Sequence, residues 1–431
     1  MTMEEISYSE NAGSLDEIYK KHRLHAESEM SSILSSTYST PQGAFEDFVE
    51  EAEKKLMFNF DAFVSRSGHS LSSDLISISS SRKSKPQAAD YMQLTQADDG
   101  YLRMIGERAD KRIRIEIKEG EAKSLSIALA NFRAPLVSKI EIILRKNAKL
   151  KLFAMFVSDQ KKDSLNASST SIVAEKGASA EINMLHNEDA YTYAMHFSST
   201  SLDQDSHVSF NSAYVGSKSC IARNYASLRG ERSSFSLSSS LAMSKEQKFD
   251  IFNSSSNSGA GSSYSGDAHV ILSGSSLGFV KDMSGIAPNA KGANAYIKER
   301  AIVVGARARI SMLPDMSINE NDVKATHSAA SAPIDEENLF YLMSKGISRS
   351  VAESMILEGF IADNLSKIQD PIARSIILSH LHEKVLSGEF GKVIETSSAG
   401  AWANASSSKE MFDGSSKYSG QEAEQASLSG I

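Results

Sequence analysis

The sequence contains one cysteine, Cys220, among 431 residues. A single cysteine cannot form a disulfide within the chain, and it cannot supply a zinc or iron–sulfur site built only from thiolates. In its strand-like segment, "GSKSCIARNYA", Cys220 has no visible activating cation. We therefore expect a small buried side chain rather than a nucleophile.

An excess of positive charge is also missing. Lys and Arg number 46 against 54 Asp and Glu, a net charge of −8, so no sequence-wide attraction to nucleic acid or to an anionic membrane is expected. No apolar run reaches the roughly 18–20 residues of a membrane helix. The N-terminus carries acidic residues where a signal peptide has a basic head, which indicates a cytoplasmic protein.

Familiar catalytic motifs are absent as well. The sequence has no phosphate-binding P-loop, no convincing dinucleotide-binding glycine pattern after a strand, and no G-x-S-x-G elbow. The segment "HNEDAYTYAMH" offers His186, Glu188, Asp189 and His196, but in a strand these side chains point to different faces, which argues against a metal site. Asp203 and Asp205 could share a face, as a carbohydrate-active β-helix enzyme would need, but their segment resembles a turn. We expect no enzymatic activity.

The chain divides into four regions. Residues 1–89 show helical spacing, with Thr40 and Pro41 suited to a helix start, and end in a Ser-rich linker at 65–89. Residues 90–330 have the period of strands. Residues 331–390 are helical again. Residues 391–431 are rich in Gly, Ser and Ala, and this composition predicts a flexible tail.

The region 90–330 repeats one pattern, a strand, a polar turn and another strand. "KRIRIEIKEG" alternates strictly, and turn centres near 147, 177, 231, 274 and 306 are spaced by roughly 30 residues or longer multiples. Ser and Ala at inward positions suit a narrow stacked core. The pattern predicts a stacked β-solenoid, with a β-sandwich as the alternative.

Helix punctuation after residue 331 is clear. Asp335 can cap a helix that Gly346 ends, Ser348 can cap a second that Gly359 ends, and Asp370 with Pro371 starts a third. Their apolar stripes either dock on the solenoid or bind a partner. His327 lies just before these helices at the expected end of a sheet, where an edge could pair with another chain; it is either structural or a neutral metal ligand.

At this junction the sequence resembles the SufB/SufD family of iron–sulfur cluster assembly proteins. The resemblance runs through "PDMSINENDVKATHSAASAPIDEENLFYLMSKGISRSVAESMILEGF", residues 314–360, and extends more weakly back through "GANAYIKERAIVVGARARISMLP". The matching positions are Pro314, Ile318, Asp322, Val323, His327, Ala329, Asp335, Leu339, Phe340, Tyr341, Gly346, Gly359 and Phe360.

The resemblance implies a mainly β chain, a right-handed parallel β-helix flanked by helical regions. It also implies a scaffold that pairs through its β-helix end, where Ile318, Asp322 and Val323 are the pairing candidates. The C-terminal helices would bind the SufC ABC-type ATPase. The candidates there are Leu339, Phe340, Tyr341, Gly346, Met355, Gly359 and Phe360.

Within the family, the sequence is SufD-like. The position of the SufB cysteine is occupied by Ala308, and Ser328 follows the motif histidine where SufB has Glu. The resemblance therefore implies a SufB-like paralogue as partner and His327 as a shared ligand of a transient cluster, with no cofactor held by this chain alone. A self-pairing homodimeric scaffold and, more distantly, a β-helix carbohydrate-active enzyme are the alternatives.

Overall fold

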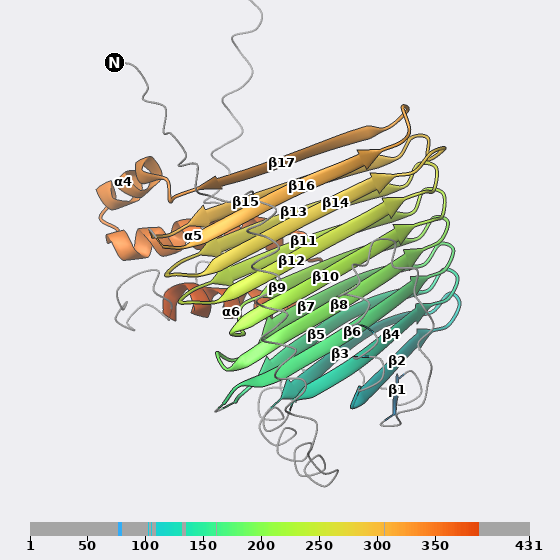
Figure 1. Ribbon diagram of the computed structural model, residues 1–431, viewed down its shortest axis with the longest axis horizontal. Coiled ribbons are helices and arrows are strands. Elements are labelled where there is room, and N and C mark those ends of the chain that lie inside the picture. Colours follow the sequence, from blue (N-terminus) through green and yellow to red (C-terminus); the bar gives the residue numbers. More distant parts are fainter. Residues whose placement is uncertain are drawn as a thin grey trace, which may run out of the picture. The chain divides into compact units, whose positions relative to one another are not determined.

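The computed structural model describes residues 76–79, 102, 105, 109–131, 135–160, 162–305 and 307–387. Within them, short strands stack into two sheets and three helices follow (Figure 1). The helices predicted before residue 75 and the tail at 391–431 lie outside the described residues. None of the described helices is long and apolar enough to span a bilayer.

From β2 onward, successive strands of the chain alternate between the two sheets, so each of these connections crosses from one sheet to the other. The nine-stranded sheet has the order β1 (Ile76–Ser79), β2 (Lys111–Ile117), β4 (Leu136–Leu144), β6 (Ser164–Ala174), β8 (Thr192–Leu202), β10 (Ser219–Leu228), β12 (Lys248–Asn257), β14 (Leu277–Ile286) and β16 (Arg309–Ile318). The eight-stranded sheet has the order β17 (Lys324–Ala332), β15 (Asn294–Val303), β13 (Ser263–Leu272), β11 (Ser234–Met243), β9 (His207–Tyr214), β7 (Ser179–Asn187), β5 (Lys149–Ser158) and β3 (Ala122–Asn131).

Neighbouring strands in each sheet run parallel, apart from the antiparallel pair β1–β2. Side chains one turn apart therefore stack. Asn224 donates to Asn253, 29 positions later, at 2.9 Å, and the hydroxyls of Ser255 and Ser284 lie 2.7 Å apart at the same separation. The predicted parallel β-solenoid is confirmed, since a sandwich would not give this regular parallel register.

The alternation of residues along the sequence explains which side chains fill the interior. Ile113, Ile115 and Ile117 alternate with more exposed residues on β2, and all three are buried between the sheets. The expected turns at 147 and 177 are occupied by Asn147 (φ +58°) and Gly177 (φ +69°), in the left-handed region that Asn and Gly tolerate best. These turns direct each strand back across the core.

Two local features differ from the predictions. The segment expected to be a linker contains strand β1, which pairs with β2. The second helix, α5 (Arg349–Leu365), also continues through Gly359 instead of ending there. A glycine inside a helix costs about 1 kcal/mol relative to Ala, and the burial of Ile361 and Leu365 beyond it outweighs that cost.

The other helix boundaries follow the predicted caps. In α4 (Glu336–Ser344), the Asp335 side chain accepts from the backbone N–H groups of Glu337 and Asn338. Gly346 follows with φ +87°, as a glycine after a helix end does. α6 (Pro371–Ser387) starts after Asp370, whose carboxylate accepts from the N–H of Ile372 at 2.9 Å.

The helices α5 and α6 pack on the eight-stranded sheet, against β11, β13 and β7. Buried Asn364 of α5 donates to the Ser239 carbonyl (2.9 Å) and accepts from the Ser238 hydroxyl (2.8 Å). Leu357, Ile361 and Leu365 of α5 are buried in one cluster with Leu185 and Ile271 of the sheet, so part of the apolar helix surface docks on the solenoid. This is one of the two roles that the sequence left open.

Candidate functional site

His327 lies on β17, the edge strand of the eight-stranded sheet, paired with Ile297 of β15. Its side chain is exposed, and the described residues offer its imidazole no hydrogen-bond partner. On the other sheet, β16 is likewise an edge strand. We call β16 and β17 together the terminal rung, and Figure 1 shows them at one end of the stack.

The predicted pairing residues lie in or beside the terminal rung. Ile318 ends β16 and is 46% exposed, a large fraction for an isoleucine. Asp322 is exposed in the connection to β17, and Val323 is half-buried. Their placement gives this end of the solenoid both apolar and acidic surface.

The helix candidates separate into surface and interior residues. Phe340 and Tyr341 on α4 are 74% and 60% exposed. Gly346 follows α4, while Met355 is half-buried and Gly359 exposed on α5. Leu339, in contrast, is buried, so its side chain does not belong to the surface that α4 presents; its role in binding the ATPase stays a prediction. Phe360 stacks on His269 of β13, with ring centroids 4.8 Å apart, and docks α5 on the solenoid.

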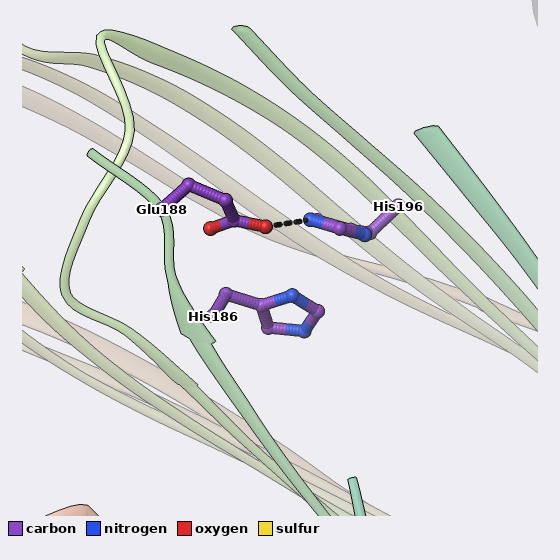
Figure 2. Close-up of side chains that lie close together, drawn as sticks. All are labelled: His186, Glu188 and His196. Atoms are coloured by element: carbon purple, nitrogen blue, oxygen red, sulfur yellow. Dashed lines mark hydrogen bonds and ion pairs between the residues drawn. The ribbon is translucent and has the colours of Figure 1, made fainter. Parts of the chain in front are cut away.

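Inside the solenoid, the structure brings together three residues that strand geometry alone would separate. His186, Glu188 and His196 are buried, and their potential ligand atoms lie within 4.8 Å of one another. Figure 2 shows the Glu188 carboxylate facing the His196 ring, with His186 below. The sequence-based argument against a metal site at these residues is therefore wrong as to geometry.

The reason is the position of the turn. His186 is on β7, Glu188 follows that strand, and His196 is on β8 in the opposite sheet. "HNEDAYTYAMH" is thus not one strand but two strands that face each other across the core. Asp189 belongs to the turn itself, where its carboxylate accepts from the backbone N–H groups of Tyr191 and Gln160, each at 2.7 Å.

Hydrogen bonds hold two members of the cluster, Glu188 and His196. His196 Nε2 lies 2.9 Å from Glu188 Oε1, and His196 Nδ1 lies 2.7 Å from the Ser168 hydroxyl. Asn166 donates to the same Glu188 oxygen at 3.2 Å. The next turn of the solenoid packs closely against the backbone of Glu188. A Cβ at Gly216 would lie 1.9 Å from the Glu188 carbonyl oxygen, so only glycine fits at that position.

His186 is held by aromatic contacts. Its ring stacks on Phe156 (4.8 Å between centroids) and on Tyr214 (4.6 Å), and lies 4.0 Å from the His196 ring. Burial, with a smaller contribution from His196, lowers the pKa of His186 well below its ordinary value. The imidazole is therefore neutral near pH 7, the form that binds metals. A small cavity borders both histidines and is also lined by Ser168, Ser198, Tyr214 and Asn224.

One signal in the sequence could have located this cluster. Where two strands of a solenoid meet at a turn, inward-facing residues on either side of the turn are neighbours across the core. His186 and His196 stand on either side of the polar segment at 187–191. Because this segment is a turn and not part of a strand, the two histidines lie opposite each other.

Cys220 is buried on β10, as predicted from its segment. Burial, reinforced by the Glu188 carboxylate, raises the pKa of its thiol well above the ordinary value. Because the thiolate is the form that acts as nucleophile and ligand, this cysteine is unreactive near neutral pH.

Comparison with known proteins adds a family assignment to this geometry. Residues 128–360 match the family model described as "SUF system FeS cluster assembly, SufBD core domain". An iron–sulfur cluster assembly SufBD family protein of Synechocystis is 32% identical over 98 residues, which cover 23% of this chain and 20% of the relative. The iron–sulfur cluster assembly protein SufD of Bacillus subtilis is 29% identical over 117 residues (27% of each chain), and that of Escherichia coli 27% identical over 103 residues (24% of each).

The aligned segments thus span about a quarter of the length of these relatives. The family model covers more than half of the chain and includes most of the solenoid, the terminal rung and the first part of the helices. On this match, the chain belongs to the SufBD family of the SUF iron–sulfur cluster assembly system.

Proposed function

We propose that this chain is a SufD-like, non-catalytic scaffold subunit in iron–sulfur cluster assembly, and that its terminal rung pairs with a SufB-like paralogue. Family membership supports the general role, since the family description names cluster assembly. Two relatives named SufD support the finer one.

The observation that carries the proposal is the exposed terminal rung. β16 and β17 are 10 and 9 residues long, and each is the edge of its sheet. Eight of the nine residues of β17 are exposed. A long edge strand with free backbone donors and acceptors readily pairs with another chain, and stable proteins normally cover such an edge. Because the solenoid ends in two such edge strands, they could each pair with one edge strand of a partner that also ends in two.

His327 would supply one ligand to the iron–sulfur cluster that is assembled at this interface. The only cysteine is buried with a protonated thiol, so thiolate ligands for a cluster would have to come from the partner. A histidine on the edge strand can add one further ligand. Ligands shared between two chains would release the cluster when the chains move apart.

The α4 surface is the proposed contact for the SufC ABC-type ATPase. Phe340, Tyr341 and Met343 are large, exposed apolar residues on a nine-residue helix. Aromatic residues and Met are enriched at the centres of protein interfaces. Leu339 on the same helix is buried, so it lies beneath this surface.

Co-expression with a cysteine-bearing SufB-like paralogue and the ATPase tests the proposal, with native mass spectrometry as the readout. We expect one complex that contains all three chains. A homodimer of this chain with the ATPase, lacking the paralogue, would support the self-pairing alternative and contradict the heterodimer.

His327→Ala should leave that complex intact and lower the yield of assembled cluster, measured by absorption spectroscopy and iron content. His207→Ala is the matched control, because His207 is also an exposed histidine on a strand but lies at the start of β9, away from the terminal rung. Equal cluster yields for the two variants would remove His327 from the proposed site.

A further inference from the structure

We propose that His186, Glu188 and His196 form a buried binding site for one first-row divalent transition-metal ion of the Zn²⁺ or Fe²⁺ class. The site lies inside the solenoid between β7 and β8, and is separate from the surface at which cluster assembly is proposed. The proposed ion stays bound to this chain and is distinct from the iron of the cluster that is assembled.

Unpaired polar atoms are the first argument. Among the described residues, His186 Nδ1 and Glu188 Oε2 have no hydrogen-bond partner, although both atoms are buried. His186 and Glu188 are only 2% and 3% exposed. A buried polar atom without a partner costs about 1–3 kcal/mol, so native proteins usually give such atoms a partner or a ligand. Two of them in one three-residue cluster are accounted for by a cation.

The surroundings of the cluster are those of a metal site. Histidine ligands commonly use one ring nitrogen for the metal and bind a neighbouring polar group with the other. His196 has this arrangement, because its Nδ1 contacts the Ser168 hydroxyl at 2.7 Å while its Nε2 faces Glu188. Asn166 orients the carboxylate, and the rings of Phe156 and Tyr214 hold His186 on either side.

The donor set defines the kind of ion. Two imidazoles and one carboxylate bind Zn²⁺ at open sites and are also the ligands of many Fe²⁺ sites. Mg²⁺ prefers six oxygen ligands and does not fit. The adjoining cavity is lined by Ser168 and Ser198 as well as by apolar Met184 and Phe210, and it can accommodate a water molecule as a further ligand.

The test uses the full-length protein. It is unfolded with chelator and refolded with Zn²⁺, Fe²⁺ under anaerobic conditions, or Mg²⁺, each alone, so that access to the interior does not limit binding. After desalting, metal content is measured by plasma mass spectrometry. We expect about one equivalent of Zn²⁺ or Fe²⁺ per chain and no retained Mg²⁺. A wild-type chain that retains neither transition metal would overturn the proposal.

Two variants remove ligand atoms but preserve shape. His186→Phe keeps an aromatic ring between Phe156 and Tyr214, and Glu188→Gln keeps the length of the side chain. Both should lose the metal. Ser168→Ala should retain it with about 10–100-fold lower affinity, the usual effect of removing a group that orients a ligand. His207→Phe, at an exposed histidine, should bind as the wild type does.

Metal retained equally by His186→Phe, Glu188→Gln and the wild type would show adventitious binding and refute the site. If the ligand variants do not fold, the absorption spectrum of wild-type protein refolded with Co²⁺ decides. Bands of a nitrogen–oxygen coordination sphere without a thiolate charge-transfer band support the site, and a spectrum of hydrated Co²⁺ refutes it.

Discussion

Glu299 on β15 shows how one buried residue links stability to pH. Its side chain is 0% exposed, and burial raises the pKa of its carboxyl to about 9, with a smaller effect from Asp282. Asp282 faces it from β14 and accepts from the Tyr264 hydroxyl at 2.6 Å, and burial raises the pKa of Asp282 to about 7. In the folded chain, Glu299 therefore keeps its proton at neutral pH.

The unfolded chain releases the Glu299 proton above about pH 4. Between that pH and about 9, the folded state binds more protons than the unfolded state, so the free energy of unfolding falls as pH rises. Below pH 4 both states are protonated, and the contribution of this group to stability is complete.

Glu299→Gln should remove this dependence. Gln has nearly the same shape and no charge, so we expect the variant to be more stable than the wild type by about 2–4 kcal/mol at pH 8 and nearly equal to it at pH 4. Urea denaturation at pH 4, 6 and 8 measures the difference. Glu119→Gln, at a side chain 66% exposed, is the control. A difference between Glu299→Gln and the wild type that does not change with pH would contradict the burial argument.

At the scale of the element, α4 depends on its cap because little of it is buried. The Asp335 carboxylate accepts from the N–H groups of Glu337 (2.9 Å) and Asn338 (3.3 Å). Leu339 is the buried residue of the helix. The helix presents the exposed aromatic surface proposed to bind the ATPase, so its folding is coupled to that role.

Asp335→Ala should destabilise α4 locally by about 1 kcal/mol, because it leaves two helix N–H groups without a protein partner. Amide hydrogen exchange in α4 should become about fivefold faster, while exchange in the solenoid strands stays unchanged. Ser348→Ala is the matched control, since Ser348 occupies the same position before α5 but makes no capping hydrogen bond with its side chain. Equal effects of the two substitutions would show that the Asp335 bonds do not stabilise α4.

At the scale of the whole molecule, the terminal rung is where a stack of parallel strands stops. The Lys324 N–H donates to the Ala293 carbonyl, toward β15. In a parallel strand the bonding direction alternates by residue, so the backbone groups of Ala325, His327 and Ala329 point away from the stack. These are the groups that a partner strand would pair with.

Ala329→Pro removes one outward donor but keeps the hydrogen bonds to β15, and proline is tolerated on an edge strand. We expect the isolated chain to keep its stability, while its affinity for the SufB-like paralogue falls about tenfold or more, measured by titration calorimetry. Ala329→Val enlarges the same side chain but retains the N–H, and should bind as the wild type. Unchanged affinity of the proline variant would mean that the partner does not pair with β17.

The sequence by itself determined the local structure. The two-residue alternation at Ile113–Ile117 and the turn residues at 147 and 177 predict the solenoid, and Asp335 and Asp370 predict helix starts, because such preferences act over a few neighbouring residues. Tertiary structure decided the rest. In the folded protein, α5 continues through Gly359 and Leu339 is buried. His186 and Glu188 lie opposite His196. Proximity in a solenoid depends on which strand faces which across the core. If a strand begins one residue earlier or later after a turn, each of its side chains moves from the core to the surface or the reverse. Residue spacing alone therefore could not reveal the buried cluster.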